Sequence, residues 1–169
     1  MSSIQSTQAF GSAYRALAGM VLGGIVAGIL DIVYAFIASG LRGGTPLKVL
    51  QSVASGLLGR SAFEGGIGTG IIGLICHLVI MIGAAAVYFV ASKYFAMLRE
   101  RPVVSGAIFG ILVYLFMNFV VLPLSAIPFR ITYSPLVLAM GFVSHALLVG
   151  IPIALFIRYF STSRPAQAA

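Results

Sequence analysis

Charged residues are scarce in this sequence, and their scarcity excludes most classes of soluble protein. Only 8% of the 169 residues are charged and three are acidic, whereas 60% are hydrophobic and the mean hydropathy is +1.12. A water-soluble domain of this size could not bury so much apolar surface behind its own polar surface. We therefore expect an integral membrane protein whose surroundings are a lipid bilayer.

Other shortages exclude further classes. The single cysteine, Cys76, rules out an internal disulfide and lies in an apolar run, where the expected role is that of a small buried hydrophobic residue. The net charge of +7 does not indicate nucleic-acid binding, because Lys and Arg stand at the ends of apolar runs, where headgroups and topology require them. The sequence has no nucleophile–base signature, phosphate loop or zinc-protease motif, so we do not expect an enzyme.

Four segments are long enough to cross a bilayer, which takes about 20 apolar residues. They cover residues 17–38, 68–91, 103–122 and 136–157. The first apolar run is too long for a signal peptide and contains Asp31, so it is interpreted as a retained helix. The sequence predicts an all-α membrane protein with one domain, 1–169, and four transmembrane helices.

The basic residues indicate an orientation with both termini in the cytoplasm. That orientation places six of them inside and four outside. The inner set is Arg15, Lys93, Arg99, Arg101, Arg158 and Arg164, and the outer set is Arg42, Lys48, Arg60 and Arg130. Three of the inner cations have a neighbouring tyrosine, a pair typical of interfacial anchors.

A short amphipathic helix is predicted between the first two spans, over residues 46–58. Thr45 is placed to cap it, Pro46 suits its first turn, and Gly59 ends it. Its apolar face consists of Leu47, Leu50, Val53, Leu57 and Leu58. With about 13 residues it is too short to span, so it lies along the outer membrane surface or folds over the mouth of the bundle. We favour the surface position.

Each spanning segment carries one strongly polar residue: Asp31, His77, Asn118 and His145. At about 1.5 Å per residue, all four lie roughly 8–14 Å from the outer helix ends. A carboxylate at this depth is unfavourable by at least about 2.5 kcal/mol, so it requires partners. We expect one polar layer in which Asp31 bonds to an imidazole and Asn118 bridges.

Further residues support this layer or the packing around it. Tyr34, Tyr114 and Ser144 are expected to extend the network, and Pro152 to loosen the fourth helix beside it. Small residues four apart let helices approach closely. The expected packing positions are Gly19, Gly23, Gly24, Gly28, Gly73, Gly106, Gly110 and Gly141. The sequence does not give the oligomeric state, but these glycines exceed what one central seam needs, which is compatible with a homodimer.

The second and fourth spans share a short pattern. "GLICH" (Gly73 to His77) matches "GFVSH" (Gly141 to His145), each with glycine one turn before a histidine. Together with the predicted orientation, this favours two hairpins related by an axis along the membrane normal.

Several roles remain open for the polar layer. One is transport, in which the layer binds and releases a proton or cation, since histidine titrates near neutral pH. Another is structural: the layer pins the helices in register in a structural or accessory subunit that transports nothing. No cofactor is expected, although the two histidines are also compatible with haem or, with Asp31, a transition metal.

The order of features resembles a known type of protein. The carrying stretches are "GGIVAGILD" (Gly23 to Asp31), the outer insert, "VVLPLS" (Val120 to Ser125) and "GFVSHALLVGIPIAL" (Gly141 to Leu155). They resemble small bacterial inner-membrane proteins of the YagU-like type. This resemblance implies a multi-pass protein of the bacterial cytoplasmic membrane and supplies no catalytic residues.

Overall fold

The computed structural model describes residues 2–129 and 134–162, and the side chains of residues 14–129 and 134–161. Every regular element in these ranges is helical. Four helical stretches are long and apolar enough to cross a membrane: Tyr14–Gly40, Gly66–Tyr94, Pro102–Leu124 and Pro135–Ser161. The predicted helical class is confirmed, and the chain is compatible with a multi-pass membrane protein.

The spans are built from elements of unequal regularity. The first two are the continuous helices α1 (Ser2–Gly40) and α3 (Gly66–Tyr94). The third comprises α5 (Pro102–Phe116), the π-helical η2 (Met117–Val121) and α6 (Leu122–Leu124). The fourth comprises α7 (Pro135–Ser144), the π-helical η3 (His145–Gly150) and α8 (Ile151–Thr162). The stretches long and apolar enough to span begin and end within four residues of the predicted bounds, although α1 itself starts earlier, at Ser2.

Short elements connect the spans. Between α1 and α3 lie α2 (Pro46–Leu58) and the 3₁₀ turn η1 (Gly59–Phe63), and α4 (Met97–Glu100) lies between α3 and α5. Oγ1 of Thr45 accepts a hydrogen bond from the Lys48 amide at 3.3 Å and so caps α2. Gly59 has a φ of 60°, a conformation that favours glycine and ends the helix.

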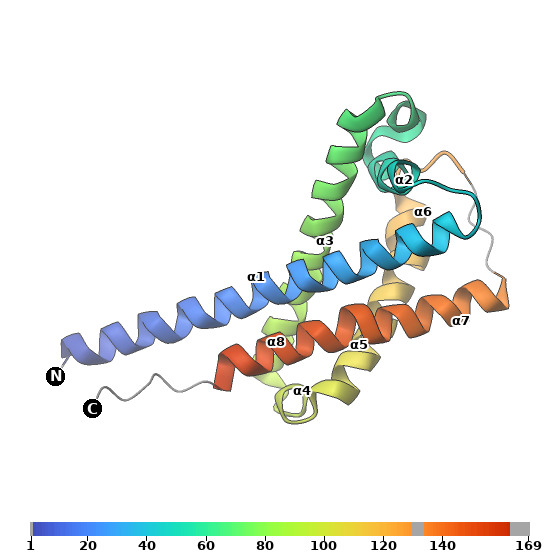
Figure 1. Cartoon of the computed structure of the whole chain (residues 1–169). Helices are drawn as coiled ribbons and strands as arrows, with labels where there is room; N and C mark the ends of the chain where they lie inside the picture. The colour runs from blue at the N-terminus through green and yellow to red at the C-terminus, as the bar shows by residue number, and fades with distance from the viewer. Residues whose placement is uncertain (1, 130–133, 163–169) are drawn as a thin grey trace.

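The spanning helices form two crossing pairs. In Figure 1, α1 runs alongside the unit made of α7, η3 and α8, while α3 and α5 cross behind them. α3 packs on α1, α5 packs on η3 and α8, and α1 and α8 pack on each other. The second and fourth spans therefore have little direct contact, and the first span packs against both of them.

The two ends of the molecule are distinct. The start of α1, the end of α8 and α4 lie at one end, called here the α4 end (Figure 1). The end of α1, α2 and the start of α7 lie at the other, the α2 end. Five of the predicted inner cations belong to segments near the α4 end: Arg15, Lys93, Arg99, Arg101 and Arg158. Three of the predicted outer cations belong to the α2 end: Arg42, Lys48 and Arg60. Arg130 and Arg164 lie outside the described residues.

All eight expected packing glycines lie against another helix. A β-carbon added at any of them would come within 3.0 Å of an atom on a neighbouring element. Gly19 and Gly23 face α8, whereas Gly24 and Gly28 face α3, so two stripes of α1 serve two partners. These contacts form within one chain. The glycine stripes therefore do not require a second copy, and the homodimer loses the argument that favoured it.

Candidate functional site

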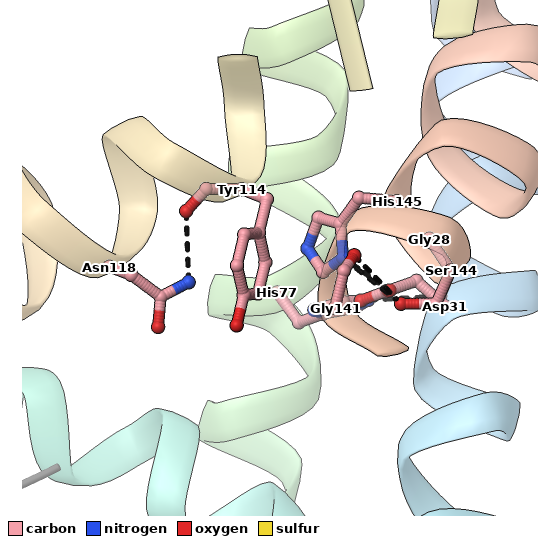
Figure 2. Close-up of polar contacts among 8 residues, drawn as sticks. All are labelled: Gly28, Asp31, His77, Tyr114, Asn118, Gly141, Ser144 and His145. Atoms are coloured by element: carbon pink, nitrogen blue, oxygen red, sulfur yellow. Dashed lines mark hydrogen bonds and ion pairs between the residues drawn. The ribbon is translucent and has the colours of Figure 1, made fainter. Parts of the chain in front are cut away.

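The centre of the site is a carboxylate between two imidazoles from different helices. Oδ2 of Asp31 lies 4.0 Å from Nε2 of His77, and Oδ1 lies 3.9 Å from Nδ1 of His145. Figure 2 shows these side chains converging from α1, α3 and η3. All three are largely shielded: the side chains of Asp31, His77 and His145 are 13%, 8% and 17% exposed. We call these three residues the triad.

The ring of His77 is held by a backbone contact. Nε2 lies 2.9 Å from the carbonyl oxygen of Gly28, one turn before Asp31 on α1. Because a carbonyl only accepts hydrogen bonds, this contact requires a proton on Nε2. The nitrogen that faces Asp31 is therefore a donor.

His145 is held by two neighbours besides Asp31. Its Nδ1 lies 3.4 Å from Oγ of Ser144, and its ring packs edge to face against Tyr114 with centroids 4.9 Å apart. Oγ of Ser144 donates its only hydrogen to the carbonyl of Gly141 at 3.1 Å, so in its contact with His145 it accepts. Nδ1 then carries the proton on the side that faces Asp31, whereas the single hydrogen on Nε2 of His77 is donated to the Gly28 carbonyl.

The fourth residue of the predicted layer has a different immediate partner. Nδ2 of Asn118 donates to the carbonyl oxygen of Tyr114 on its own helix at 2.9 Å. Asn118 also lines a cavity that reaches Asp31, His77 and His145. The structure thus brings three of the four polar residues together at Asp31 and places the fourth on the wall of the same cavity.

Two cavities reach the triad. The first, of about 490 Å³, lies between α1, α2 and α7 and is called here the Arg42 cavity. Its polar lining includes Asp31, Tyr34, Ser39, Arg42, Lys48, Ser52, Tyr114, Ser144 and His145. The second, of about 650 Å³, lies between α2, α3 and η2 and is called the Asn118 cavity; Cys76 and Ser125 also line it. Asp31, Ser52 and His145 line both cavities.

Both cavities extend from the triad toward the α2 end, because most of their remaining lining residues belong to α2 or to the parts of the spans near it. The Asn118 cavity also reaches Val79, Ile80 and Met81, which follow His77 in the direction of the α4 end. An apolar core packs on this other side of the triad. That core consists of Ala27, Met81, Ala85, Tyr88, Val149, Ile153, Ala154 and Ile157. The two cavities therefore open the triad mainly toward the α2 end.

α2 covers the two cavities. It packs on α3, where the carbonyl of Leu50 lies against Gly73 and the side chain of Leu47 against Gly70. Nε2 of the buried Gln51 donates to the Gly66 carbonyl at 3.1 Å. The backbone N–H of Ala126 donates to the Gly56 carbonyl at 2.9 Å, which joins α2 to the segment after α6.

The face of α2 that is buried differs from the predicted leucine face. Gln51, Ala54 and Ser55 are buried, whereas Leu57 is 70% exposed and Leu58 39%. Small side chains allow the close approach to α3, while Leu57 and Leu58 at the end of α2 stay exposed. The packing of α2 over the cavities favours the arrangement over the mouth of the bundle and not the surface position.

Both π-helical segments lie beside the site, and each precedes a proline by two residues. η2 ends at Val121 before Pro123, and η3 ends at Gly150 before Pro152. Proline lacks an N–H and its ring clashes with the carbonyl four residues earlier, which a wider turn relieves. η3 begins at His145 and η2 includes Asn118, so the wider turns set the direction of two of the predicted polar residues.

The triad does not form a recognisable metal site. Within residues 2–129 and 134–162, no group of three or more His, Cys, Asp or Glu side chains is placed to share one metal ion. The haem alternative stays a prediction.

Comparison with protein-family models, curated proteins and solved structures gives no match for this chain.

Sequence reasoning did not identify the cationic lining of the Arg42 cavity or the Gly28 carbonyl. The first had a detectable signal. Asp31, Tyr34, Ala35, Ala38, Ser39 and Arg42 recur at helical spacing and share one face of α1. The Gly28 carbonyl had no detectable signal, because every residue has a backbone carbonyl and the sequence does not show which one accepts a hydrogen bond from another helix.

Proposed function

We propose that this chain is a multi-pass protein of a bacterial cytoplasmic membrane in which the triad binds and releases a transported proton. The observation that carries the proposal is the position of Asp31. Its carboxylate lies within 4.0 Å of two imidazole nitrogens. Asp31 also lines two cavities that extend toward the α2 end. Histidine and aspartate within a span, shielded from lipid and reached by a cavity, are typical of proton relays.

The charge around the triad favours a proton over a metal cation. Arg42 and Lys48 line the Arg42 cavity, and their positive charges oppose the entry of another cation. A proton does not need to pass them as a free ion, since it moves between hydroxyl groups, water and imidazole. The other titratable or charged side chains on the two cavity walls are Tyr34, Arg42, Lys48, Cys76 and Tyr114.

The orientation also belongs to this proposal. With both termini in the cytoplasm, the α2 end and its two cavities face outward, and the apolar core closes the cytoplasmic side. α2 then lies at the outer surface over the cavities. In this arrangement, transport requires the packing between α1, α3 and α8 to open toward the α4 end.

A structural role is the second candidate, and one contact favours it. The hydrogen bond from His77 to the Gly28 carbonyl joins α3 to α1 and needs no cavity. In that role the triad would set the register of the helices and nothing would pass. Loss of stability without proton flux would support this candidate.

The test is proton flux in liposomes that contain a pH-sensitive dye, driven by a potassium diffusion potential with valinomycin. Native protein is compared with Asp31→Asn, which keeps the shape of the side chain and removes its charge. Glu64→Gln is the matched control, because Glu64 is exposed near the α2 end and lines neither cavity. We expect flux from the native protein and from Glu64→Gln, and background flux from Asp31→Asn. Native flux equal to that of protein-free liposomes would overturn the proposal.

A further inference from the structure

The Arg42 cavity has the lining of an anion site. One wall is the face of α1 that carries Asp31, Tyr34, Ala35, Ala38 and Ser39, continued by Arg42 in the turn after the helix, and the facing wall of α7 carries Val137, Met140, Gly141 and Ser144. The small residues on both walls leave the space open. Asp31 lies nine residues before the end of α1 at Gly40, so about 14 Å of helix separate the triad from the turn that carries Arg42.

Two cations meet at the mouth of this cavity. Arg42 follows α1 and Lys48 lies in the first turn of α2, and both line the cavity. The turn that joins the helices depends on Gly43, with a φ of 79°, and on Gly44, whose amide donates to the Ser39 carbonyl at 2.9 Å. This tight turn brings the two cations to one mouth.

Neither cation is neutralised within the part of the chain that the structure describes. The ion pairs there are those of Asp31 with the two histidines. The positive end of the α2 dipole adds to the same region, because Gly44, two residues before α2, and Lys48, in its first turn, line the cavity. Asp31, the acid in the lining, lies at the other end beside two imidazoles.

We propose that the Arg42 cavity binds an oxyanion of the phosphate class, with Arg42 and Lys48 as its main ligands. The guanidinium group supplies paired N–H donors and the ammonium group a point charge, the combination that recognises phosphate oxygens. Tyr34, farther along the wall, supplies a hydroxyl donor. The phosphate belongs either to a soluble phosphate monoester or to the headgroup of an anionic lipid, since the cavity opens at the end of the spans.

The site is coupled to the triad by charge. A negative Asp31 repels an anion in the same cavity, whereas a proton on the triad removes that repulsion. Oxyanion affinity should therefore rise as pH falls, with Asp31, His77 and His145 as the responding groups and Tyr34, Arg42, Lys48 and Tyr114 as the other titratable or charged side chains of the lining. This coupling alone rests on the proposed function; the oxyanion site does not.

The first experiment measures binding of glycerol 3-phosphate by calorimetry to protein in dodecyl maltoside, a detergent without phosphate. The double variant Arg42→Gln/Lys48→Gln removes two charge-assisted contacts and should weaken binding by at least about tenfold. Arg60→Gln is the matched control, because Arg60 is an exposed cation near the α2 end that does not line the cavity. It should bind as the native protein does.

The second arm separates the two sources of phosphate. Phosphatidylglycerol is added to the same samples, and retained lipid is counted by native mass spectrometry. A lipid-headgroup site retains the lipid in a manner that depends on Arg42 and Lys48 and competes with glycerol 3-phosphate, whereas a site for a soluble monoester does not. Absence of saturable glycerol 3-phosphate binding together with equal lipid retention by native and double variant would overturn the proposal, as would equal losses in the double variant and Arg60→Gln.

The coupling is tested with sulfate, whose charge is constant between pH 6 and 8. Native protein should bind sulfate more tightly at pH 6 than at pH 8, and Asp31→Asn should show a smaller difference, because only the two histidines then respond. Equal affinity of the native protein at the two pH values would overturn the coupling. Oxyanion binding without proton flux would contradict the proposed function and leave the site standing. Proton flux without oxyanion binding would do the reverse.

Discussion

Nε2 of His77 on α3 donates to the carbonyl oxygen of Gly28 on α1 at 2.9 Å, and the same nitrogen lies 4.0 Å from Asp31 one turn further along α1. The histidine therefore contacts a fixed backbone acceptor and a titratable side chain at once. The backbone contact takes the single hydrogen on Nε2 and sets the orientation of the ring, and this orientation keeps the imidazole beside the carboxylate.

We expect His77→Leu to destabilise the fold more than His145→Leu. The first change removes a buried hydrogen bond between helices, which contributes about 1–2 kcal/mol. The second removes a 3.4 Å contact with the adjacent Ser144 and an edge-to-face ring contact. Unfolding in sodium dodecyl sulfate, followed by circular dichroism, measures both. Equal losses would show that the Gly28 contact has no special weight.

Gly110→Ala should separate α5 from the fourth span. A β-carbon at this position would overlap the carbonyl oxygen of His145, a backbone atom that cannot rotate away. We expect a loss of about 2 kcal/mol or more in the free energy of unfolding. Gly83→Ala is the control, since open space surrounds that position, and alanine there should be neutral or slightly stabilising.

Gly73→Ala should displace α2 from α3, because the new β-carbon would overlap the Leu50 carbonyl. Cys76 lines the Asn118 cavity beneath α2 and is the only cysteine, so its reaction rate with a soluble maleimide reports this displacement. We expect a several-fold faster reaction in detergent. Gly68→Ala, where open space surrounds the position, should react at the native rate. A native rate for Gly73→Ala would mean that α2 stays docked.

Pro152→Ala should lower proton flux without lowering the stability of the fold. Alanine restores an N–H that can donate to the Leu148 carbonyl, so the π-helical turn can contract to an α-helix. An α-helical turn holds about one residue fewer than a π-helical turn, so this contraction rotates the residues before it by about 100° relative to α8. His145 then moves away from Asp31. Proton flux should fall while the free energy of unfolding rises by between zero and about 3 kcal/mol. Pro135→Ala, in the first turn of α7, should change neither.

The spanning segments were predictable because hydrocarbon imposes a strong and local constraint. Each span needs a long apolar run with its backbone bonded internally, and such runs are visible in one sequence. The short helix 46–58 was predictable for a local reason too, since Thr45, Pro46 and Gly59 are terminal signals. Its buried face was not, because burial of Gln51 depends on where α3 places Gly66 and Thr69.

The sequence by itself determined that Asp31, His77 and His145 lie at similar depth, since depth follows from counting residues along a helix. Only the tertiary structure decided that one carboxylate lies between both imidazoles, that two cavities reach it, and that Arg42 and Lys48 share one of them. The reason is physical: rise per residue is a property of each helix, whereas rotation, crossing and the wider turns before Pro123 and Pro152 arise from contacts between helices that no single segment encodes.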